Sequence, residues 1–251
     1  MADAVEKPGR KPHSKGFLAA NLVVAAGFLG VLFLFAMLVS RGTSNGWSSY
    51  KPKGGDVFSK AQNMADHVAP AYKYNGEPIA VVQAQPLLYQ DAVVDGIAFT
   101  RQPFRKIGSP FKQFEPSGST IAYVFCGSAP RCGLPTAGAQ DTVPMLRRET
   151  LELALYTFKY SPSVKSIVGL LPPTSGSAAN YAIYLRRRNF ENELSKPLDA
   201  TLPRHKVLSY QQLSPVEKAT VDRLTMKNTY QSQFSQGANG RTLLVLRSVG
   251  Q

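Results

Sequence analysis

The longest hydrophobic segment of the chain runs from residue 17 to residue 39. It contains no charged residue, and Asn21 is its only strongly polar member. At about 1.5 Å of rise per residue, a helix of this length covers the roughly 30 Å hydrocarbon core of a bilayer. We therefore predict a transmembrane helix over residues 17–39, through which the chain contacts the lipid bilayer.

The charges on either side of this segment predict its orientation. Four Lys or Arg residues crowd the tail 1–16, whereas Arg41 stands alone on the other side until Lys51. The positive-inside rule then favours a cytoplasmic tail over 1–16 and a C-terminal part outside the cell membrane. A cleaved signal peptide is the alternative, but its apolar core is usually only about 7–15 residues long, and no convincing A-x-A-like site follows residue 39.

After the hydrophobic segment, the pattern changes twice. Residues 40–55 are rich in Gly, Ser and Lys, which is typical of a linker. The part after the hydrophobic segment, residues 41–251, is long enough for one well-filled domain or at most two small ones, and we expect a single domain over residues 56–251. In this domain Asp56 is placed to cap a helix with apolar residues at helical spacing from Val57 to Val68, which Pro70 ends.

The next segments predict strands and a βαβ unit. Two or three strands are expected between residues 79 and 99, where β-branched and aromatic residues alternate with turn signals. Residues 121–126 then form a strand, 145–160 a helix, and 167–171 a second strand, which predicts a parallel pair joined by a crossover helix. Asp141, Thr142 and Pro144 favour a helix start near residue 145, and the polar side of this helix, with Arg148, Glu149 and Glu152, is expected to face solvent.

The C-terminal part completes an α+β pattern. We expect a strand over 181–185, a short helix or irregular segment over 190–198 and a closing strand over 242–249. Ser214 and Glu217 form a capping box with Pro215 in the first turn, which predicts a helix from there to about Gln233. The predicted fold is therefore a single N-terminal transmembrane helix followed by an exported α+β domain, in which a mixed sheet has helices on one face and contains one βαβ unit.

The chain is basic, with a formal net charge of +13. Only four of its 29 Lys and Arg residues and two of its 16 Asp and Glu residues lie before residue 41, so the exported part carries about +11. A surplus of this size attracts acidic partners, so we expect an acidic protein or an anionic envelope surface to bind here. Nucleic acid is disfavoured, because the basic residues are dispersed and match no nucleic-acid-binding module.

Arg186, Arg187 and Arg188 form the one run of three basic residues and are the candidate contact for an anion or a partner. Because they follow directly on a predicted strand, their side chains should alternate between the two faces, so that all three could not hold one anion. A strand end that serves only solubility is the alternative interpretation.

Cys126 and Cys132 are predicted to form a disulfide. The turn-rich sequence Gly-Ser-Ala-Pro-Arg between them allows the two sulfurs to meet, and an exported domain lies in an oxidising compartment. Two separate buried thiols are the alternative. A redox-active pair is disfavoured because the C-x-x-C spacing is absent, and a zinc site because none of the three histidines stands at ligand spacing.

The sequence contains no recognisable catalytic or cofactor motif. A nucleophile elbow, an H-E-x-x-H zinc motif and Gly-rich phosphate-binding loops are all absent. Glu149 and Glu152 could be drawn as a carboxylate pair, but the solvated side of a helix is the simpler interpretation, and His67 and His205 are expected to be surface residues. We therefore assign no catalytic residue, no metal ligand and no cofactor.

Two functions fit these patterns. The first is a non-catalytic, membrane-anchored extracytoplasmic interaction or assembly module of the cell envelope, and its layout resembles that of inner-membrane scaffold subunits in bacterial secretion and conjugation machines. The second is a membrane-tethered envelope enzyme or ligand-binding receptor, in which polar groups scattered along the sequence converge in the fold.

The anchor prediction can be tested on the membrane-extracted protein. We expect the chain to keep its first forty residues, because its apolar segment is longer than that of a signal peptide. Intact-mass spectrometry measures this directly. A mature protein that lacks residues 1–40 would overturn both the anchor and the predicted topology.

Overall fold

The computed structural model describes residues 47–101, 113–134, 139–174, 180–203, 209–236 and 240–248. The predicted transmembrane segment 17–39 lies outside these residues. Among the helices that are described, none has the length and apolar character needed to cross a membrane.

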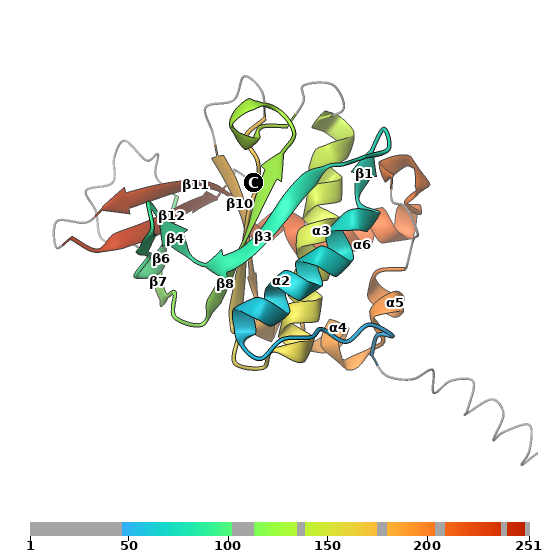
Figure 1. The fold of residues 1–251 in the computed structure, drawn as a ribbon, viewed down its shortest axis with the longest axis horizontal. Coiled ribbons are helices and arrows are strands. Elements are labelled where there is room, and N and C mark those ends of the chain that lie inside the picture. The colour runs from blue at the N-terminus through green and yellow to red at the C-terminus, as the bar shows by residue number, and fades with distance from the viewer. Residues whose placement is uncertain are drawn as a thin grey trace, which may run out of the picture. The chain divides into compact units, whose positions relative to one another are not determined.

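A mixed eight-stranded sheet forms the framework of the domain (Figure 1). Its pairs β8–β9 and β12–β6 are parallel and the others are antiparallel. In spatial order the strands are β3 (Ala80–Pro86), β8 (Thr120–Gly127), β9 (Ser166–Leu170), β10 (Asn180–Arg186), β11 (Thr229–Gln236), β12 (Thr242–Ser248), β6 (Gly96–Thr100) and β7 (Gln113–Pro116). Two short hairpins pair β1 (Lys73–Tyr74) with β2 (Glu77–Pro78) and β4 (Leu88–Tyr89) with β5 (Ala92–Val93).

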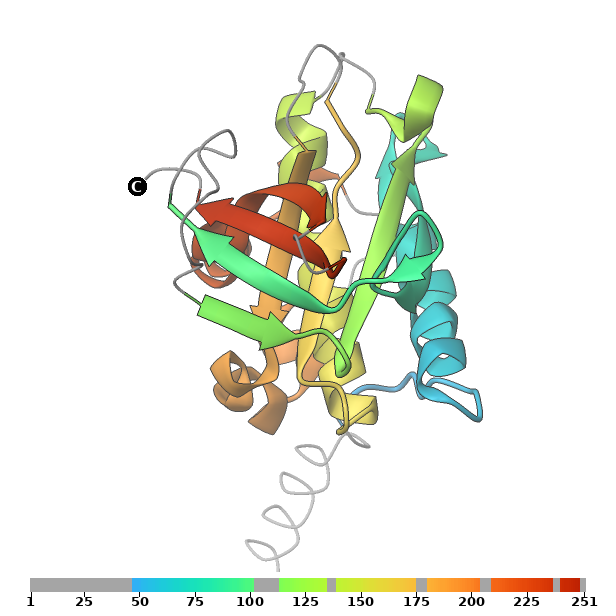
Figure 2. The same cartoon turned by 90° about the vertical axis from the view of Figure 1, so that its left-hand side faces the viewer.

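The sheet bends so strongly that one half covers the other. Figure 2 shows β6, β7 and β12 crossing in front of β8, β9 and β10. A small apolar core fills the space between the halves, with Ile97 and Leu244 from one half against Val168 and Tyr184 from the other. The rings of Phe99 and Tyr184 lie 5.3 Å apart between their centroids. The curvature therefore gives the central strands a dry face without any helix on that side.

The helices cover the opposite face of the central strands, where the main core lies (Figure 1). The α-helices are α2 (Val57–Val68), α3 (Ala139–Tyr160), α4 (Glu191–Ser195), α5 (Leu198–Thr201) and α6 (Pro215–Thr225). Short 3₁₀ turns connect them: η1 (Ala69–Ala71), η3 (Pro130–Cys132), η4 (Arg187–Asn189), η5 (Tyr210–Gln212) and η6 (Met226–Asn228). The predicted α+β fold, with a mixed sheet and helices on one face, is confirmed for the described residues.

The βαβ unit and the first helix agree with the sequence patterns. Strands β8 and β9 are parallel neighbours with α3 between them in the chain. Helix α2 ends at Val68, and the Asp56 carboxylate accepts hydrogen bonds from the backbone N–H groups of Phe58 and Ser59 at 2.9 and 3.0 Å. This N-cap satisfies donors that the first helical turn leaves free.

Two helix boundaries differ from the prediction. Helix α3 begins at Ala139, so Pro144 lies within it and not at its start, and the missing proline N–H removes one intrahelical hydrogen bond. Helix α6 ends at Thr225, and the segment predicted to continue it to Gln233 instead forms β11. This segment pairs on both sides, with β10 and with β12, and that pairing outweighs a local sequence poor in strand-forming residues.

The capping box at the start of α6 is only half formed. The Ser214 hydroxyl accepts a hydrogen bond from the Glu217 backbone N–H at 3.2 Å, as expected. The Glu217 carboxylate binds Arg148 of α3, 2.7 Å from its guanidinium. Glu217 therefore joins two helices, a long-range role that the local motif does not reveal.

The amide of Gln62 occupies part of the free edge of β3. Its oxygen accepts a hydrogen bond from the Ala84 N–H at 2.8 Å, and its nitrogen donates to the Val82 carbonyl at 3.3 Å. These are bonds that a neighbouring strand would otherwise make. One side chain of α2 thus caps the edge strand at its middle.

The described part of the predicted linker belongs to the domain. The Trp47 ring packs edge-on against Tyr156 and Tyr160, at centroid distances of 5.5 and 5.9 Å. The Trp47 carbonyl accepts a hydrogen bond from the Leu198 N–H at 2.9 Å. The compact unit therefore begins at Trp47, nine residues before the predicted boundary at Asp56.

Candidate functional site

The three consecutive arginines line one recess at an end of the sheet. We name it the basic recess; its volume is about 480 Å³. It is lined by Glu115, Pro116, Ser119, Lys165, Ser166, Arg186, Arg187, Arg188 and Glu191. Four cationic side chains therefore share a small space with two carboxylates.

A change of backbone geometry brings the arginines together. Arg186 is the last residue of β10, but Arg187 and Arg188 already belong to the 3₁₀ turn η4. Side chains in a 3₁₀ turn are spaced about 120° apart and do not alternate between two faces. The alternation expected for a continuing strand therefore does not apply to Arg187 and Arg188, because β10 ends at Arg186, and all three arginines line the same recess.

Arg186 is held rigidly by an internal counter-ion. Its guanidinium binds both oxygens of Glu115 of β7, at 2.6 and 3.2 Å, and the Tyr184 hydroxyl also donates to this carboxylate. The same guanidinium lies over the rings of Phe99 and Tyr184, 5.1 and 5.0 Å from their centroids. These contacts join β10 to β7 across the bend of the sheet.

The ionisation of this trio follows from its contacts. Partial burial works to raise the pKa of Glu115, but the hydrogen bonds from Tyr184 and Arg186 outweigh it, and the pKa lies below its ordinary value. Burial, together with the hydrogen bond to Glu115, raises the pKa of Tyr184 to about 12. Glu115 is therefore ionised and Tyr184 neutral at physiological pH.

The other cations of the basic recess are not neutralised by ion pairs with described residues. Arg187 is anchored through a hydrogen bond from its guanidinium to the Phe158 carbonyl, and its backbone N–H donates to the Lys165 carbonyl at 2.9 Å. Lys165 and Arg188 are exposed. Within the described residues, no ion pair is formed by Lys165, Arg187 or Arg188.

A second recess lies at the opposite ends of β9 and β10 and is mainly apolar. We name it the apolar recess; its volume is about 360 Å³. It is lined by Leu134, Val143, Pro144, Leu146, Arg147, Leu171, Pro172, Thr174, Tyr181, Met226 and Thr229. Arg147 is its charged member: its guanidinium pairs with Asp222, while its buried Nε has no hydrogen-bond partner among the described residues.

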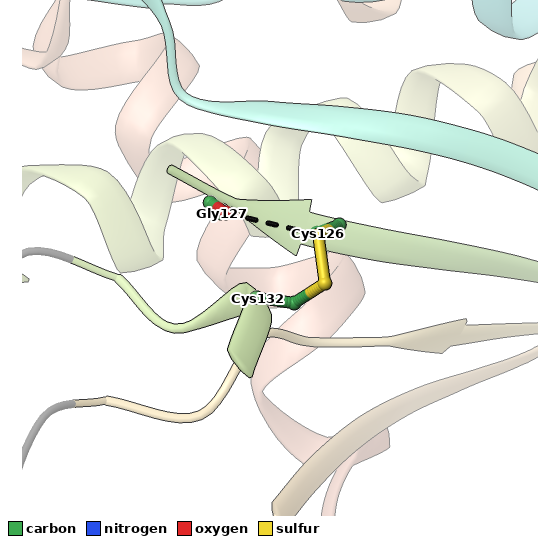
Figure 3. Close-up of a disulfide and its surroundings, with 3 residues drawn as sticks. All are labelled: Cys126, Gly127 and Cys132. Carbon is green, nitrogen blue, oxygen red and sulfur yellow. Dashed lines mark hydrogen bonds between the residues drawn. A yellow bond between two sulfur atoms is a disulfide. The ribbon is translucent and has the colours of Figure 1, made fainter. Parts of the chain in front are cut away.

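The predicted disulfide between Cys126 and Cys132 is present (Figure 3). Cys126 lies near the end of β8 and Cys132 in the turn η3 that follows it. The residue two positions further, Leu134, donates its backbone N–H to the Pro173 carbonyl at 2.9 Å and lines the apolar recess. The crosslink therefore fixes the loop that forms one wall of this recess.

The polar side of α3 is buried and not solvated, contrary to prediction. Arg148 is 1% exposed, and its guanidinium binds Glu217 at 2.7 Å, Glu152 at 3.0 Å and the Pro203 carbonyl at 2.8 Å. It also donates to the Tyr72 hydroxyl, which in turn donates to Glu152 at 2.6 Å. This network ties α3 to α6 and to the segment after α2, so its chemistry is structural.

Glu149 stands apart from this network. It is fully buried, and neither of its carboxylate oxygens has a hydrogen-bond partner among the described residues. Burial, together with the negative charge of Glu152, raises its pKa well above the ordinary value. The surroundings of Glu149 therefore favour its neutral, protonated form.

The histidines do not extend either recess within the described residues. His67 stacks on Tyr50, with ring centroids 3.6 Å apart, and His205 lies outside the described residues. A search of the described part of the chain finds no group of three or more His, Cys, Asp or Glu side chains placed to hold a metal ion.

Comparisons with protein-family models, with curated proteins and with solved structures find no match to this chain.

Glu149 predicts how stability depends on pH. Because the pKa of Glu149 is raised in the folded state, the folded chain keeps a proton that the unfolded chain releases above about pH 4.5. The free energy of unfolding therefore falls as pH rises, by up to about 1.4 kcal/mol for each pH unit. We expect Glu149→Gln to flatten this dependence between about pH 5 and pH 8 and to make the variant the more stable protein at the upper end. Urea unfolding followed by the fluorescence of Trp47, the sole tryptophan, measures it.

The exposed Glu77 supplies the matched control. Glu77→Gln should leave the pH profile of the free energy of unfolding unchanged. If Glu149→Gln gives a profile parallel to that of the parent, the buried carboxyl does not carry this proton.

Proposed function

We propose that this chain is a single-pass, membrane-anchored protein whose domain outside the membrane is a non-catalytic interaction or assembly module of the cell envelope. In this proposal residues 17–39 span the cell membrane, residues 1–16 are cytoplasmic and the basic recess binds an acidic partner. The observation that carries it is the convergence of Arg186, Arg187, Arg188 and Lys165 on one site.

The chemistry of the basic recess supports binding more than catalysis. Arginine stays protonated at any physiological pH, so it supplies a fixed positive charge and donors, and it neither takes up nor releases protons. Glu115 is bound to Arg186 and Tyr184 and has a lowered pKa, which suits a counter-ion and not a general acid. These properties suit recognition of negative charge.

The test uses the full chain in a neutral detergent and a resin that carries polyglutamate as the acidic probe. Lys165→Glu and Arg188→Glu should each elute at clearly lower salt than the parent, because exposed charges act over a screening length of about 10 Å at 0.1 M salt. Both residues are exposed and leave the Arg186 trio intact. The measurement is the salt concentration at elution.

Lys227→Glu is the matched control, since it changes the net charge equally but lies in η6, beside the apolar recess. Its elution should shift much less. Equal shifts for all three variants would mean that only the net charge matters, and the basic recess would then lose its role.

A ligand-binding receptor is the second candidate, and the apolar recess favours it. Its apolar lining and the unpartnered Nε of Arg147 suit an apolar ligand with an anionic end. We expect the domain from Trp47 onward to bind decanoate, and Val143→Trp to weaken this binding by about tenfold or more by filling the recess. Isothermal titration calorimetry measures the affinity.

Val216→Trp supplies the control, because Val216 is 76% exposed and does not line the apolar recess. It should bind decanoate like the parent. Absence of binding by the parent would remove this second candidate.

A further inference from the structure

The basic recess and the first residue of the domain are attached to the same end of α3. Lys159, in the last turn of α3, places its ammonium 5.7 Å from the centroid of the Trp47 ring. The neighbouring residue, Phe158, accepts the hydrogen bond from the Arg187 side chain. Figure 1 shows the first described residues passing beside α4, which directly follows η4. Adjacent residues of one helix thus hold the start of the domain and the basic recess.

The covalent chain limits how far this end can be from the predicted span. Seven residues, 40–46, separate residue 39 from Trp47. Even fully extended, at about 3.6 Å per residue, this length of chain reaches less than about 30 Å. If residues 17–39 span the bilayer, as proposed above, the Trp47 end of the domain stays close to the membrane surface.

Exposed cations surround this end beyond the basic recess. Lys51 and Lys53 follow Trp47, and Lys196 follows α4; all three are exposed. The acidic residues of this region are partly neutralised, since Glu115 binds Arg186 and Glu193 binds Arg223. Glu191 and Asp199 are two further acidic residues of this region, and both are exposed. Exposed cations therefore extend over this end of the domain well beyond the basic recess.

We propose that this end of the domain docks on anionic phospholipid headgroups of the bilayer that holds the anchor, and thereby fixes the orientation of the domain. This inference rests on the proposed membrane anchor. A flat layer of negative headgroups matches dispersed cations better than a single acidic protein segment does. The short tether gives the domain a high effective concentration at the membrane surface. Each cation that reaches the headgroups then raises the ratio of docked to undocked molecules by about fivefold, so several such contacts together are sufficient for docking.

The experiment measures the distance of two sites from the headgroups in nanodiscs that carry the full chain. The native cysteines are joined to each other, so a fluorophore on Asn189→Cys, in η4, or on Met226→Cys, at the apolar recess, is unique. Spin-labelled headgroups quench nearby fluorophores. With phosphatidylglycerol in the nanodisc and about 0.05 M salt, quenching at residue 189 should exceed that at residue 226 by about twofold or more, and about 0.5 M salt should clearly reduce the difference.

The charge variants decide whether the basic residues cause the docking. Adding Lys165→Glu should reduce the docked-to-undocked ratio by about 30-fold, which corresponds to reversing one charge at an anionic surface. Adding Lys227→Glu should leave the ratio nearly unchanged. Nanodiscs of phosphatidylcholine alone should show a clearly smaller difference between the two fluorophore sites, which is the part due to the tether.

Two outcomes would overturn the inference. One is equal quenching at residues 189 and 226 in anionic nanodiscs. The other is unequal quenching that ignores both salt and lipid charge, which would mean that the tether alone orients the domain. If the domain fails to dock but still binds polyglutamate through the basic recess, the partner is an acidic protein and the proposed function stands; if polyglutamate binding fails as well, both fall.

Discussion

The buried charge of Arg148 is the constraint around which the helical layer is organised. A guanidinium removed from water must have its donors satisfied, and those of Arg148 bind groups from α6, from the segment after α2 and from Pro203 at the end of α5. Each of these segments must then approach α3 within hydrogen-bonding distance. Arg148 thus holds these three segments against α3, and together they enclose this side of the helix.

The same enclosure separates two kinds of ionisable group. Arg148 and Glu217 neutralise each other in a dry environment, whereas Glu149 remains uncharged because no cation of the described residues reaches it. At the end of the sheet, the pairing of Arg186 with Glu115 leaves the exposed cations around it unmatched. The buried Arg148 thus has carboxylate partners inside the domain, whereas exposed cations without an ion pair among the described residues lie at the surface, where they can act on a partner.

The sequence predicts those parts of the fold that depend on local signals. The Asp56 cap, the βαβ unit and the disulfide each rest on residues close in the chain, and each is present. Strand β11 was missed because its polar sequence resembles a strand only when β10 and β12 pair with it. The burial of Glu149 was missed for a related reason: the groups that cover α3 come from distant parts of the chain.

The candidate site shows the same limit on a smaller scale. The run of three arginines was visible in the sequence, but their convergence depends on where β10 ends, and strand ends are uncertain by a residue or more. No sequence pattern pointed to Lys165 or Glu115, because Lys165, just before β9, and Glu115, in β7, reach the site only through the packing of the sheet. The sequence therefore identifies the arginines of this site, whereas their counter-ion, Glu115, can be identified only from the fold.

The Gln62 cap on β3 has a consequence for how this domain can associate with copies of itself. A sheet with two open edges can add strands at both and grow into a fibre. Here a side chain of α2 takes up hydrogen-bonding groups at one end of the strand order, and β7 ends the order on the other side. Strand addition at the β3 edge must therefore first displace the Gln62 amide. A molecule that can be extended at one edge alone forms a closed pair, related by a two-fold axis, and its polymerisation stops there.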